Sequence, residues 1–385
     1  MSARERLPQN VTGVDYDAEA SAFGFAGRVI DIHSHIHGAK ATEVYAKVAA
    51  AYGVRLTYTQ TRPDDIPAVR EVLKDRVRFV AIPNFSIEDK ALAFGAGYLD
   101  LIRRLATEHG ARMLKLWNAP RTREWFTGPD RDDFVELDGK WRVAAADLGV
   151  SLGMMIKTHT GDPDTWFRAR YTDRAKYGLK REHYRGLEVM LRRYRQVPWI
   201  AAHMGGSPED LDFLDGLLER HENLHLDTSA TKWMVRELSR HPRERTLAFF
   251  ERWQDRILFG SDIVTMEDQL VKKTPEQKRI SVMSDLADSP ESAASLYASR
   301  YFALRTMFEG WRGAAGERVA EDRASPIADP DLKMVEPGKF DEWSTPTLRG
   351  LKLPREILEK VYWKNAERVV MGWERGEWGV GAGRT

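Results

Sequence analysis

Short apolar runs alternate with longer amphipathic segments through most of the chain. The apolar runs occur at 29–32, 54–59, 77–83, 113–117, 151–159, 199–203, 224–227 and 257–262. Segments with helical periodicity lie between them at 41–52, 64–74, 99–109, 141–148, 187–194, 211–220 and 245–253. Strands that alternate with helices form a parallel sheet, and about eight such units predict an α/β fold of the (β/α)8 TIM-barrel type.

The segments at the two ends of the chain do not continue this alternation. Residues 1–27 are polar and rich in Gly and Ala, which predicts an N-terminal arm lying on the domain. We expect one domain at 28–372, because α/β barrels with loop insertions reach this length as single units. A short tail follows at 373–385.

Two segments after the last strand are expected to be additions to the barrel. The stretch 326–337 carries several Pro and acidic residues, which is typical of an exposed loop insertion. Residues 354–370 form an amphipathic pattern with Pro354 at the start and Gly372 beyond the end. Since Pro favours the first turn of a helix and Gly its end, this pattern predicts a C-terminal helical extension that closes the barrel.

Composition narrows the classes of protein that fit. The chain has 385 residues, 42% of them hydrophobic and 30% charged, with a formal net charge of +1. Near-neutral charge argues against a nucleic-acid binder, and no apolar run approaches the ~18 residues of a membrane span. The absence of Cys excludes disulfides, thiolate metal sites and a cysteine nucleophile. We therefore expect a cytoplasmic globular protein.

Two histidines end the first apolar run. His33 and His35 are two positions apart, so on a strand both imidazoles leave the same face. Neutral imidazole is the commonest protein metal ligand, and a rigid strand fixes such a pair in advance. The alternative is a pair of surface or core histidines near a strand end.

Further polar residues fall at or near the ends of other predicted strands: Lys115, His159, His203 and Asp262. In a barrel these ends converge on one mouth, where active sites are built. Three imidazoles and a carboxylate can hold a divalent cation and leave a position for water, whose pKa the metal lowers towards ~7. The alternatives are a loop-bonded histidine at 159, a turn histidine at 203 and a helix N-cap at 262.

These motifs resemble those of a known family. HSH at 33–35, KTHTGDP around His159, AAHMGG around His203 and LFGSD ending at Asp262 are similar to the amidohydrolase superfamily. The residues that flank these motifs most resemble the amidohydrolase-related branch of this superfamily. That branch includes aminocarboxymuconate semialdehyde decarboxylase and other nonoxidative decarboxylases. The resemblance covers about residues 28–372.

The resemblance implies a role for each matching residue. His33, His35, His159 and Asp262 match the ligands of a single metal ion. His203 matches the histidine that bonds the metal-bound water and acts as acid or base, and Asp262 would also orient that water.

Two further residues have less certain places in this pattern. Lys115 falls near the strand where binuclear members carry a carboxylated lysine, so one or two metals remain open. We interpret it as a substrate or site lysine, or as a lysine whose stem packs while its amine reaches the mouth. His37 follows the predicted strand end, so a loop role is expected for it rather than ligation.

The loops after two strands suggest the kind of substrate. Trp117, Asn118 and Arg121 follow the fourth strand, and Trp166 and Arg170 follow the fifth. Arginine beside aromatic rings suits a small planar or carboxylate-bearing substrate, because guanidinium grips a carboxylate and stacks on a ring. The alternative is ordinary packing of surface arginine over tryptophan.

The leading hypothesis is a metal-dependent hydrolase in which metal-bound hydroxide attacks an amide, ester or lactone carbonyl and His203 shuttles the proton. A nonoxidative decarboxylase of an aromatic or unsaturated acid is the alternative, and a non-catalytic barrel scaffold is the third. Nitrogen-rich ligation suits zinc, with manganese, iron or cobalt left open. The aromatic-rich stretch 297–311 could cover the barrel wall or the interface of a homo-oligomer.

Overall fold

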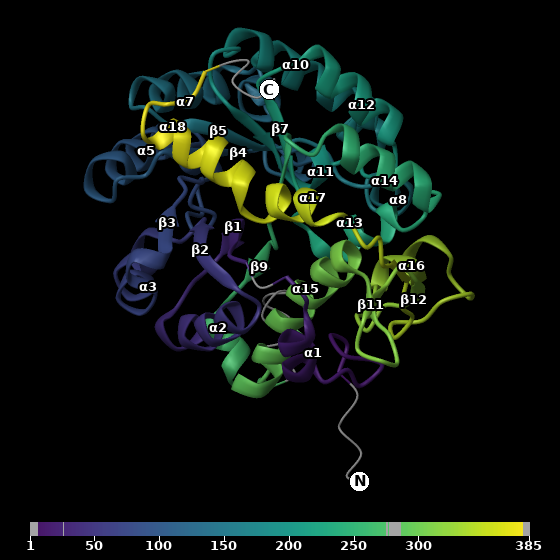
Figure 1. The fold of residues 1–385 in the computed structure, drawn as a ribbon. Helices are drawn as coiled ribbons and strands as arrows, with labels where there is room; N and C mark the ends of the chain where they lie inside the picture. The colour runs from purple at the N-terminus through teal and green to yellow at the C-terminus, as the bar shows by residue number, and fades with distance from the viewer. Residues whose placement is uncertain (1–6, 26, 275, 277–285, 380–385) are drawn as a thin grey trace.

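Parallel strands form the centre of the protein and helices surround them (Figure 1). The computed structural model describes residues 7–25, 27–274, 276 and 286–379. The central strands are β1 (Val29–His35), β2 (Val54–Thr59), β3 (Val77–Phe79), β4 (Met113–Trp117), β5 (Met155–His159), β6 (Trp199–Ala201), β7 (Leu224–Asp227), β8 (Ile257–Leu258) and β9 (Ile263–Val264).

Backbone hydrogen bonds join these strands into a closed ring. The strand orders are β3-β2-β1-β9 and β4-β5-β6-β7-β8. At one seam the Ala81 N–H donates to the Met113 carbonyl (3.0 Å), and the Lys115 N–H donates to the Ala81 carbonyl (2.7 Å). At the other seam the Ile32 N–H donates to the Phe259 carbonyl (3.0 Å). The predicted (β/α)8 barrel is therefore confirmed.

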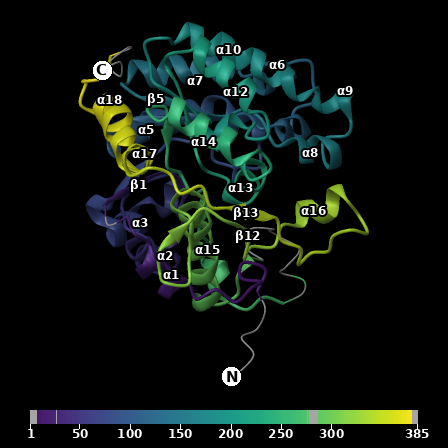
Figure 2. The same ribbon diagram turned by 45° about the vertical axis from the view of Figure 1, so that its right-hand side comes forward.

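Helices form the outer layer, and a second view shows them around the strands (Figure 2). The larger helices are α2 (Ala39–Ala51), α3 (Ile66–Leu73), α5 (Ala96–Glu108), α7 (Lys140–Ser151), α10 (His183–Arg193), α12 (Leu211–Arg220), α13 (Thr231–Leu238), α14 (Arg243–Arg252) and α15 (Pro290–Glu309). The shorter ones are α1 (Tyr16–Ala22), α4 (Lys90–Phe94), α6 (Arg131–Val135), α8 (Asp164–Ala169), α9 (Arg174–Tyr177), α11 (Ala202–Gly205), α16 (Pro330–Val335), α17 (Arg355–Glu359) and α18 (Gly372–Glu374). Two small antiparallel ribbons pair β10 (Trp311–Arg312) with β11 (Arg318–Val319) and β12 (Asp322–Ala324) with β13 (Thr347–Arg349).

Helix α15 carries most of the aromatic-rich stretch and covers the barrel wall. Tyr301 is fully buried, and its hydroxyl donates to Asp31 Oδ2 at 2.9 Å. Asp31 also accepts from the Ser261 hydroxyl at 2.6 Å, so one buried carboxylate ties α15 to β1 and to the segment after β8. The stretch 297–311 was expected to cover either the barrel wall or a subunit interface. The structure shows it packed against the barrel wall of its own chain.

One strand boundary differs from the prediction. Residues 151–159 were expected to form one strand, but α7 continues to Ser151 and β5 begins only at Met155. Gly153 has φ 76°, a left-handed conformation that turns the chain between the two elements. The apolar residues before Met155 pack without belonging to the strand, so hydrophobicity alone placed the boundary wrongly.

The stretch 326–337 is only partly the exposed excursion that its composition suggests, since residues 330, 333, 336 and 337 are exposed and the part before α16 is not. Residues 325–329 are buried, and α16 follows them. The Asp329 carboxylate pairs with Arg236 on α13, and both side chains are shielded from solvent. A long-range ion pair therefore holds this segment against the barrel.

The C-terminal helical extension is confirmed, with a longer course than expected. Helix α17 passes into π-helical turns at Lys360–Lys364 and Ala366–Met371, and the chain remains helical through α18. Gly372 therefore lies inside the helix rather than beyond its end. The Phe259 N–H donates to the Val361 carbonyl at 2.9 Å, which attaches the extension to the barrel.

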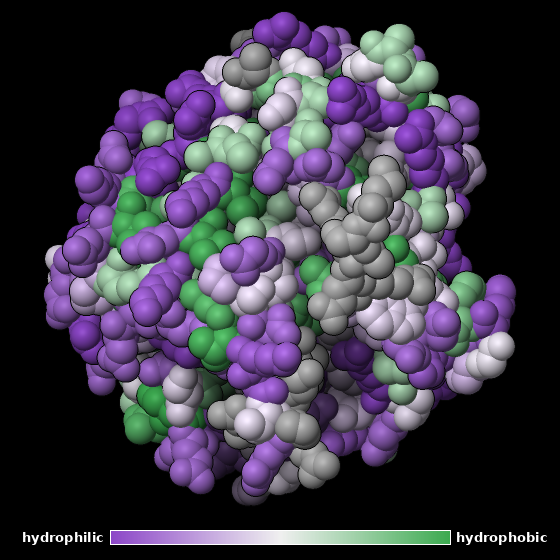
Figure 3. Space-filling view, turned by 90° about the horizontal axis from the view of Figure 1, so that it is seen from below, coloured by the Kyte–Doolittle hydropathy of each residue, from purple (hydrophilic) through white to green (hydrophobic). Residues whose placement is uncertain are grey.

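Hydrophilic side chains occupy much of the face seen in Figure 3, with smaller apolar areas among them. Among the described helices, none has both the length and the apolar composition to cross a bilayer. The division into an arm at 1–27, a domain at 28–372 and a tail at 373–385 stays a prediction. Residues 1–6, 26 and 380–385 of the arm and the tail lie outside the described residues.

Gly149 on α7 offers a test of how tightly the helices pack on the barrel. A Cβ at this position would overlap Leu114 Cδ2 on β4, and Leu114 is fully buried. We expect Gly149→Ala to lower stability by about 1–3 kcal/mol through overpacking, measured as a fall in Tm.

Gly216→Ala on α12 is the matched control. The nearest atom to its new Cβ is the flexible Arg220 Nη1 at 3.1 Å. Alanine has a higher helix propensity, by up to about 1 kcal/mol, so an unchanged or higher Tm is expected. Equal falls in Tm for both variants would contradict this account of the packing.

Candidate metal centre

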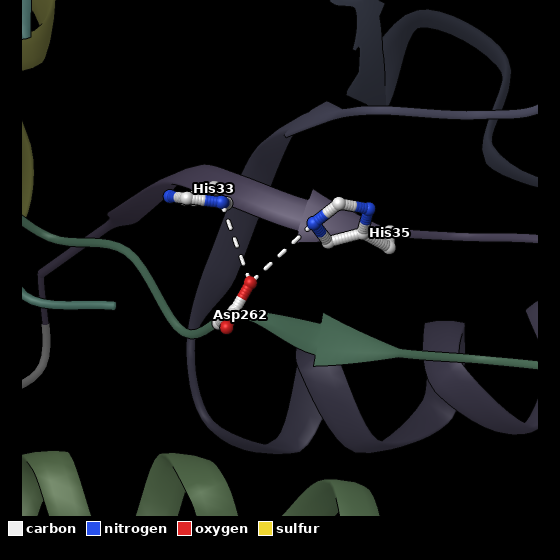
Figure 4. Close-up of side chains that lie close together, drawn as sticks. All are labelled: His33, His35 and Asp262. Atoms are coloured by element: carbon white, nitrogen blue, oxygen red, sulfur yellow. Dashed lines mark ion pairs between the residues drawn. The ribbon is translucent and has the colours of Figure 1, made fainter. Parts of the chain in front are cut away.

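Three of the four predicted metal ligands meet at the carboxyl ends of the strands. His33 and His35 lie on β1, and Asp262 lies between β8 and β9 (Figure 4). Asp262 Oδ1 is 3.3 Å from His33 Nε2 and 3.4 Å from His35 Nε2. The three ligand atoms all lie within 4.8 Å of one another, close enough to share one ion.

The charge states of these groups suit a divalent cation. Burial lowers the pKa of His33 well below its usual value and that of His35 to about 4, so both imidazoles are neutral at pH 7. Burial alone would raise the pKa of Asp262, but the surrounding imidazoles, that of His203 foremost, hold it below its usual range. Neutral imidazole nitrogens and an ionised carboxylate are the donors that such an ion requires.

Asp227 fixes the orientation of His33, and the sequence analysis missed this role. His33 Nδ1 lies 2.8 Å from Asp227 Oδ2, and both side chains are fully buried. Because the carboxylate holds a proton on Nδ1, the lone pair on Nε2 is turned towards Asp262. The signal was available, since Asp227 ends the predicted strand 224–227, just as the other candidates end theirs.

His203 lies beside this centre, although not at the strand end where it was expected. Strand β6 ends at Ala201, and His203 adopts φ 60° and ψ 46° in a left-handed turn. Its N–H donates to Asp227 Oδ1 (2.9 Å), and its Nδ1 lies 2.7 Å from Ser229 Oγ. Burial lowers the pKa of His203 to about 3, so the ring is neutral at pH 7.

His159 contacts His203 rather than joining the three-ligand group. Its Nδ1 is 3.0 Å from His203 Nε2, and its Nε2 is 2.9 Å from Asp162 Oδ1. The Asp162 carboxylate also accepts from the Tyr171 hydroxyl at 2.8 Å. Both ring nitrogens of His159 are engaged, so the ring must turn before it can act as a ligand, and its ligand role stays a prediction.

Lys115 lies inside the site. Its Nζ donates to His33 Nε2 at 2.7 Å and to Gln60 Oε1 at 2.9 Å, and burial lowers its pKa to about 8. The lone pair on His33 Nε2 cannot serve the ammonium and a metal ion at once. Metal binding therefore requires Lys115 to release His33, and the positive charge of the lysine already occupies part of the site.

His37 lies outside the ligand group, as expected for a loop residue. Its Nδ1 accepts from the Arg62 N–H at 3.2 Å and lies 3.4 Å from Asp65 Oδ2. Together with His35 it lines a cavity of about 200 Å³, to which residues 60–63 and 82–86 also contribute. This cavity borders the centre and could receive part of a small substrate.

The predicted substrate residues after β4 are placed differently from one another. The Trp117 ring lies 6.0 Å from that of His159 and stacks on Trp125, so it borders the site. Asn118 is buried, and its Oδ1 accepts from Arg142 Nε at 3.3 Å, which gives it a packing role.

Arg121 is exposed and lies 5.9 Å over the Trp125 ring. This is the surface packing that was the alternative interpretation. No hydrogen bond or ion pair within the described residues ties Arg121 to the histidines.

The predicted substrate residues after β5 are already paired with each other. Trp166 Nε1 donates to Asp331 Oδ2 at 2.6 Å, and Arg170 pairs with Asp331 Oδ1 at 3.0 Å. The Arg170 guanidinium also lies 4.3 Å over the Trp166 ring. Asp331 Oδ2 also lies 3.6 Å from Arg236 Nη1, so this carboxylate is shared by two arginines. The substrate-binding roles of Trp166 and Arg170 stay predictions.

Comparison with known proteins gives no match among curated proteins. Among solved structures, 2,6-dihydroxybenzoate decarboxylase from Rhizobium shares 13% identity, with coverage of 72% of this chain and 99% of that one and a TM-score of 0.39. A probable 2-pyrone-4,6-dicarboxylic acid hydrolase from Acinetobacter baumannii with citric acid bound shares 10%, with 70% and 99% covered and a TM-score of 0.37. An amidohydrolase from Burkholderia multivorans with bound zinc shares 12%, with 90% and 99% covered and a TM-score of 0.41.

Similarities of this degree carry no information on the reaction. The family assignment depends instead on the family model described as Amidohydrolase, which matches residues 1–371. This match confirms the resemblance seen in the histidine and aspartate motifs. The chain belongs to the amidohydrolase family.

Proposed function

We propose that the protein is a metal-dependent hydrolase of a small molecule. The observation that carries the proposal is the meeting of His33, His35 and Asp262 at the mouth of the barrel, with their ligand atoms within 4.8 Å. These residues would hold a divalent cation, and His159 would join them by turning. When bound, such an ion polarises a substrate carbonyl and makes water a better nucleophile at neutral pH.

Zinc fits this donor set best. Two or three imidazole nitrogens with one carboxylate are typical of zinc sites, whereas oxygen-rich sets favour magnesium or calcium. Manganese, iron or cobalt would also accept these ligands, because availability and geometry decide among them. The cytoplasmic location and a homo-oligomeric state stay predictions.

His203 is the proposed acid and base. The Ser229 hydroxyl donates a hydrogen bond to the Asp227 carboxylate. Ser229 Oγ can then accept a hydrogen bond from His203 Nδ1–H. This arrangement leaves a lone pair on Nε2, which faces His159 Nδ1 at 3.0 Å. Once His159 turns to join the metal ligands, Nε2 can take a proton from the attacking water and pass it to the leaving group. The buried positions of all three groups keep their geometry fixed.

Decarboxylation is the second candidate, and Lys115 is the observation that favours it. A decarboxylation leaves a carbon that must be protonated, which requires a proton donor inside the site. With a pKa lowered by burial to about 8, Lys115 can release a proton near neutral pH. Its Nζ lies 2.7 Å from His33 Nε2, within the ligand group.

A product assay separates the two reactions. The metal-loaded protein is incubated with a panel of aryl esters, lactones, amides and aryl carboxylic acids, and released acid, amine and carbon dioxide are measured. We expect release of acid or amine, its loss after chelation and its return with zinc. Carbon dioxide release alone would make the protein a decarboxylase, and a metal-free protein inactive on every compound would favour the scaffold.

The ligand assignment predicts a difference between two neighbouring histidines. His35→Ala removes an imidazole from the ligand group, so we expect at least roughly tenfold weaker metal binding and loss of activity. His37→Ala is the matched control and should retain the metal, because the His37 ring contacts Arg62 and Asp65, and its backbone bonds with Thr265 survive the substitution. Metal content is measured on the purified proteins, and equal losses in both variants would refute the assignment.

The role of His203 predicts a loss of turnover without a loss of metal. His203→Asn removes the acid and base, so we expect kcat to fall by roughly 10²–10⁴-fold while the metal content remains. His221→Asn is the control, because His221 is held near Glu188 on α10 (3.4 Å) and should leave kcat unchanged. A His203→Asn protein with normal kcat would exclude this residue from the chemistry.

A further inference from the structure

Gln60 is a buried amide that has no role in the proposed reaction. It follows β2 directly, and its N–H donates to the Ser34 carbonyl at 2.9 Å, between the two histidines of β1. Its side chain is 1% exposed, and its Nε2 is shielded from solvent with no hydrogen-bond partner in the structure. Because an unmet buried donor destabilises a fold, this amide is more costly than an apolar side chain of the same size.

The amide oxygen of Gln60 shares the Lys115 ammonium with His33. Lys115 Nζ donates to Gln60 Oε1 at 2.9 Å and to His33 Nε2 at 2.7 Å, and all three side chains are buried. In the part of the chain that the structure describes, these two atoms are the hydrogen-bond acceptors of the ammonium. The ammonium therefore connects β4 to the carboxyl ends of β1 and β2.

Metal binding would remove one of these two acceptors. His33 Nε2 also faces Asp262 Oδ1 at 3.3 Å, as the ligand atom of the three-residue group (Figure 4). A lone pair that is given to a cation cannot accept from Lys115 as well. The ammonium would then be buried beside a second positive charge, and a buried charge without a hydrogen-bond partner is costly. Gln60 Oε1 is the acceptor that remains for it.

We propose that Gln60 is a positioning residue, which holds the Lys115 ammonium while His33 gives its Nε2 to the metal ion. This inference rests on the proposed function, because it assumes the same metal site. An amide oxygen accepts well from an ammonium, whereas zinc prefers imidazole nitrogen, so each cation goes to the acceptor that suits it. Lys115 would stay bonded to a side chain that lines the cavity beside His35 and His37. One site could thereby hold a metal ion and an ammonium proton donor together.

The test measures zinc affinity at pH 7 by competition with a chromophoric chelator. Gln60→Met removes the acceptor with little change in size, so we expect zinc to bind roughly tenfold or more weakly. Gln60→Ala should act in the same direction. Gln60→Glu keeps an acceptor for the ammonium, so it should bind zinc at least as tightly as the wild type.

A double-mutant cycle separates this role from a structural one. Lys115→Met removes the competing charge, so zinc should bind more tightly than in the wild type. In that background Gln60→Met should change the affinity by less than about twofold, because no ammonium is left to hold.

Gln9→Met is the matched control. Gln9 is also a buried glutamine, and its amide donates to the Ser292 carbonyl on α15 at 3.1 Å. Loss of this amide should leave the zinc affinity unchanged, whereas a general effect of removing a buried glutamine would lower it in both proteins.

The proposal is overturned if Gln60→Met binds zinc as the wild type does, or if it weakens binding equally with and without Lys115. Zinc binding by the wild type together with either result removes the role of Gln60 alone. A wild type that binds no zinc removes the metal site and this inference together. The expected affinities in a protein inactive on every panel substrate support the role of Gln60 and remove the proposed function.

Discussion

The carboxylate of Asp227 is the interaction on which the geometry of the site depends. It accepts from His33 Nδ1, from the His203 N–H and from Ser229, and it lies 3.8 Å from Lys157 Nζ on β5. One buried charge thus connects groups carried by β1, β5, β7 and the turn after β6. Because these groups are far apart in the chain, their alignment requires the closed barrel, and loss of this carboxylate would release the proposed ligand and the proposed base together.

Local patterns predicted the barrel well. Strands 54–59, 113–117 and 224–227 have the expected bounds, because period, apolar content and turn residues are properties of neighbouring positions. The convergence of His33, His35 and Asp262 was also predictable, since parallel strands place their carboxyl ends together. The left-handed turn at His203 was not, because hydrogen bonds from distant residues impose it.

Pairing over long distances gives some of the predicted substrate residues partners that the sequence did not reveal, and their substrate roles stay predictions. Arg170 beside Trp166 has the composition of a carboxylate site, but Asp331 occupies it from a segment that composition suggested to be exposed.

Backbone strain at the mouth of the barrel lowers the stability of the fold. Left-handed φ angles occur at His203, Met204, Ala230 and Asp262, none of them glycine, and all follow central strands. Such conformations cost roughly 1–3 kcal/mol each and persist only where surrounding contacts impose them. Two buried carboxylates supply such contacts, since Asp227 bonds the turn at His203 and Asp31 bonds Ser261 next to Asp262. This strain fixes the positions of a proposed base, His203, and a proposed ligand, Asp262. Relaxed turns would avoid the strain, so its presence is consistent with selection for chemistry rather than for stability.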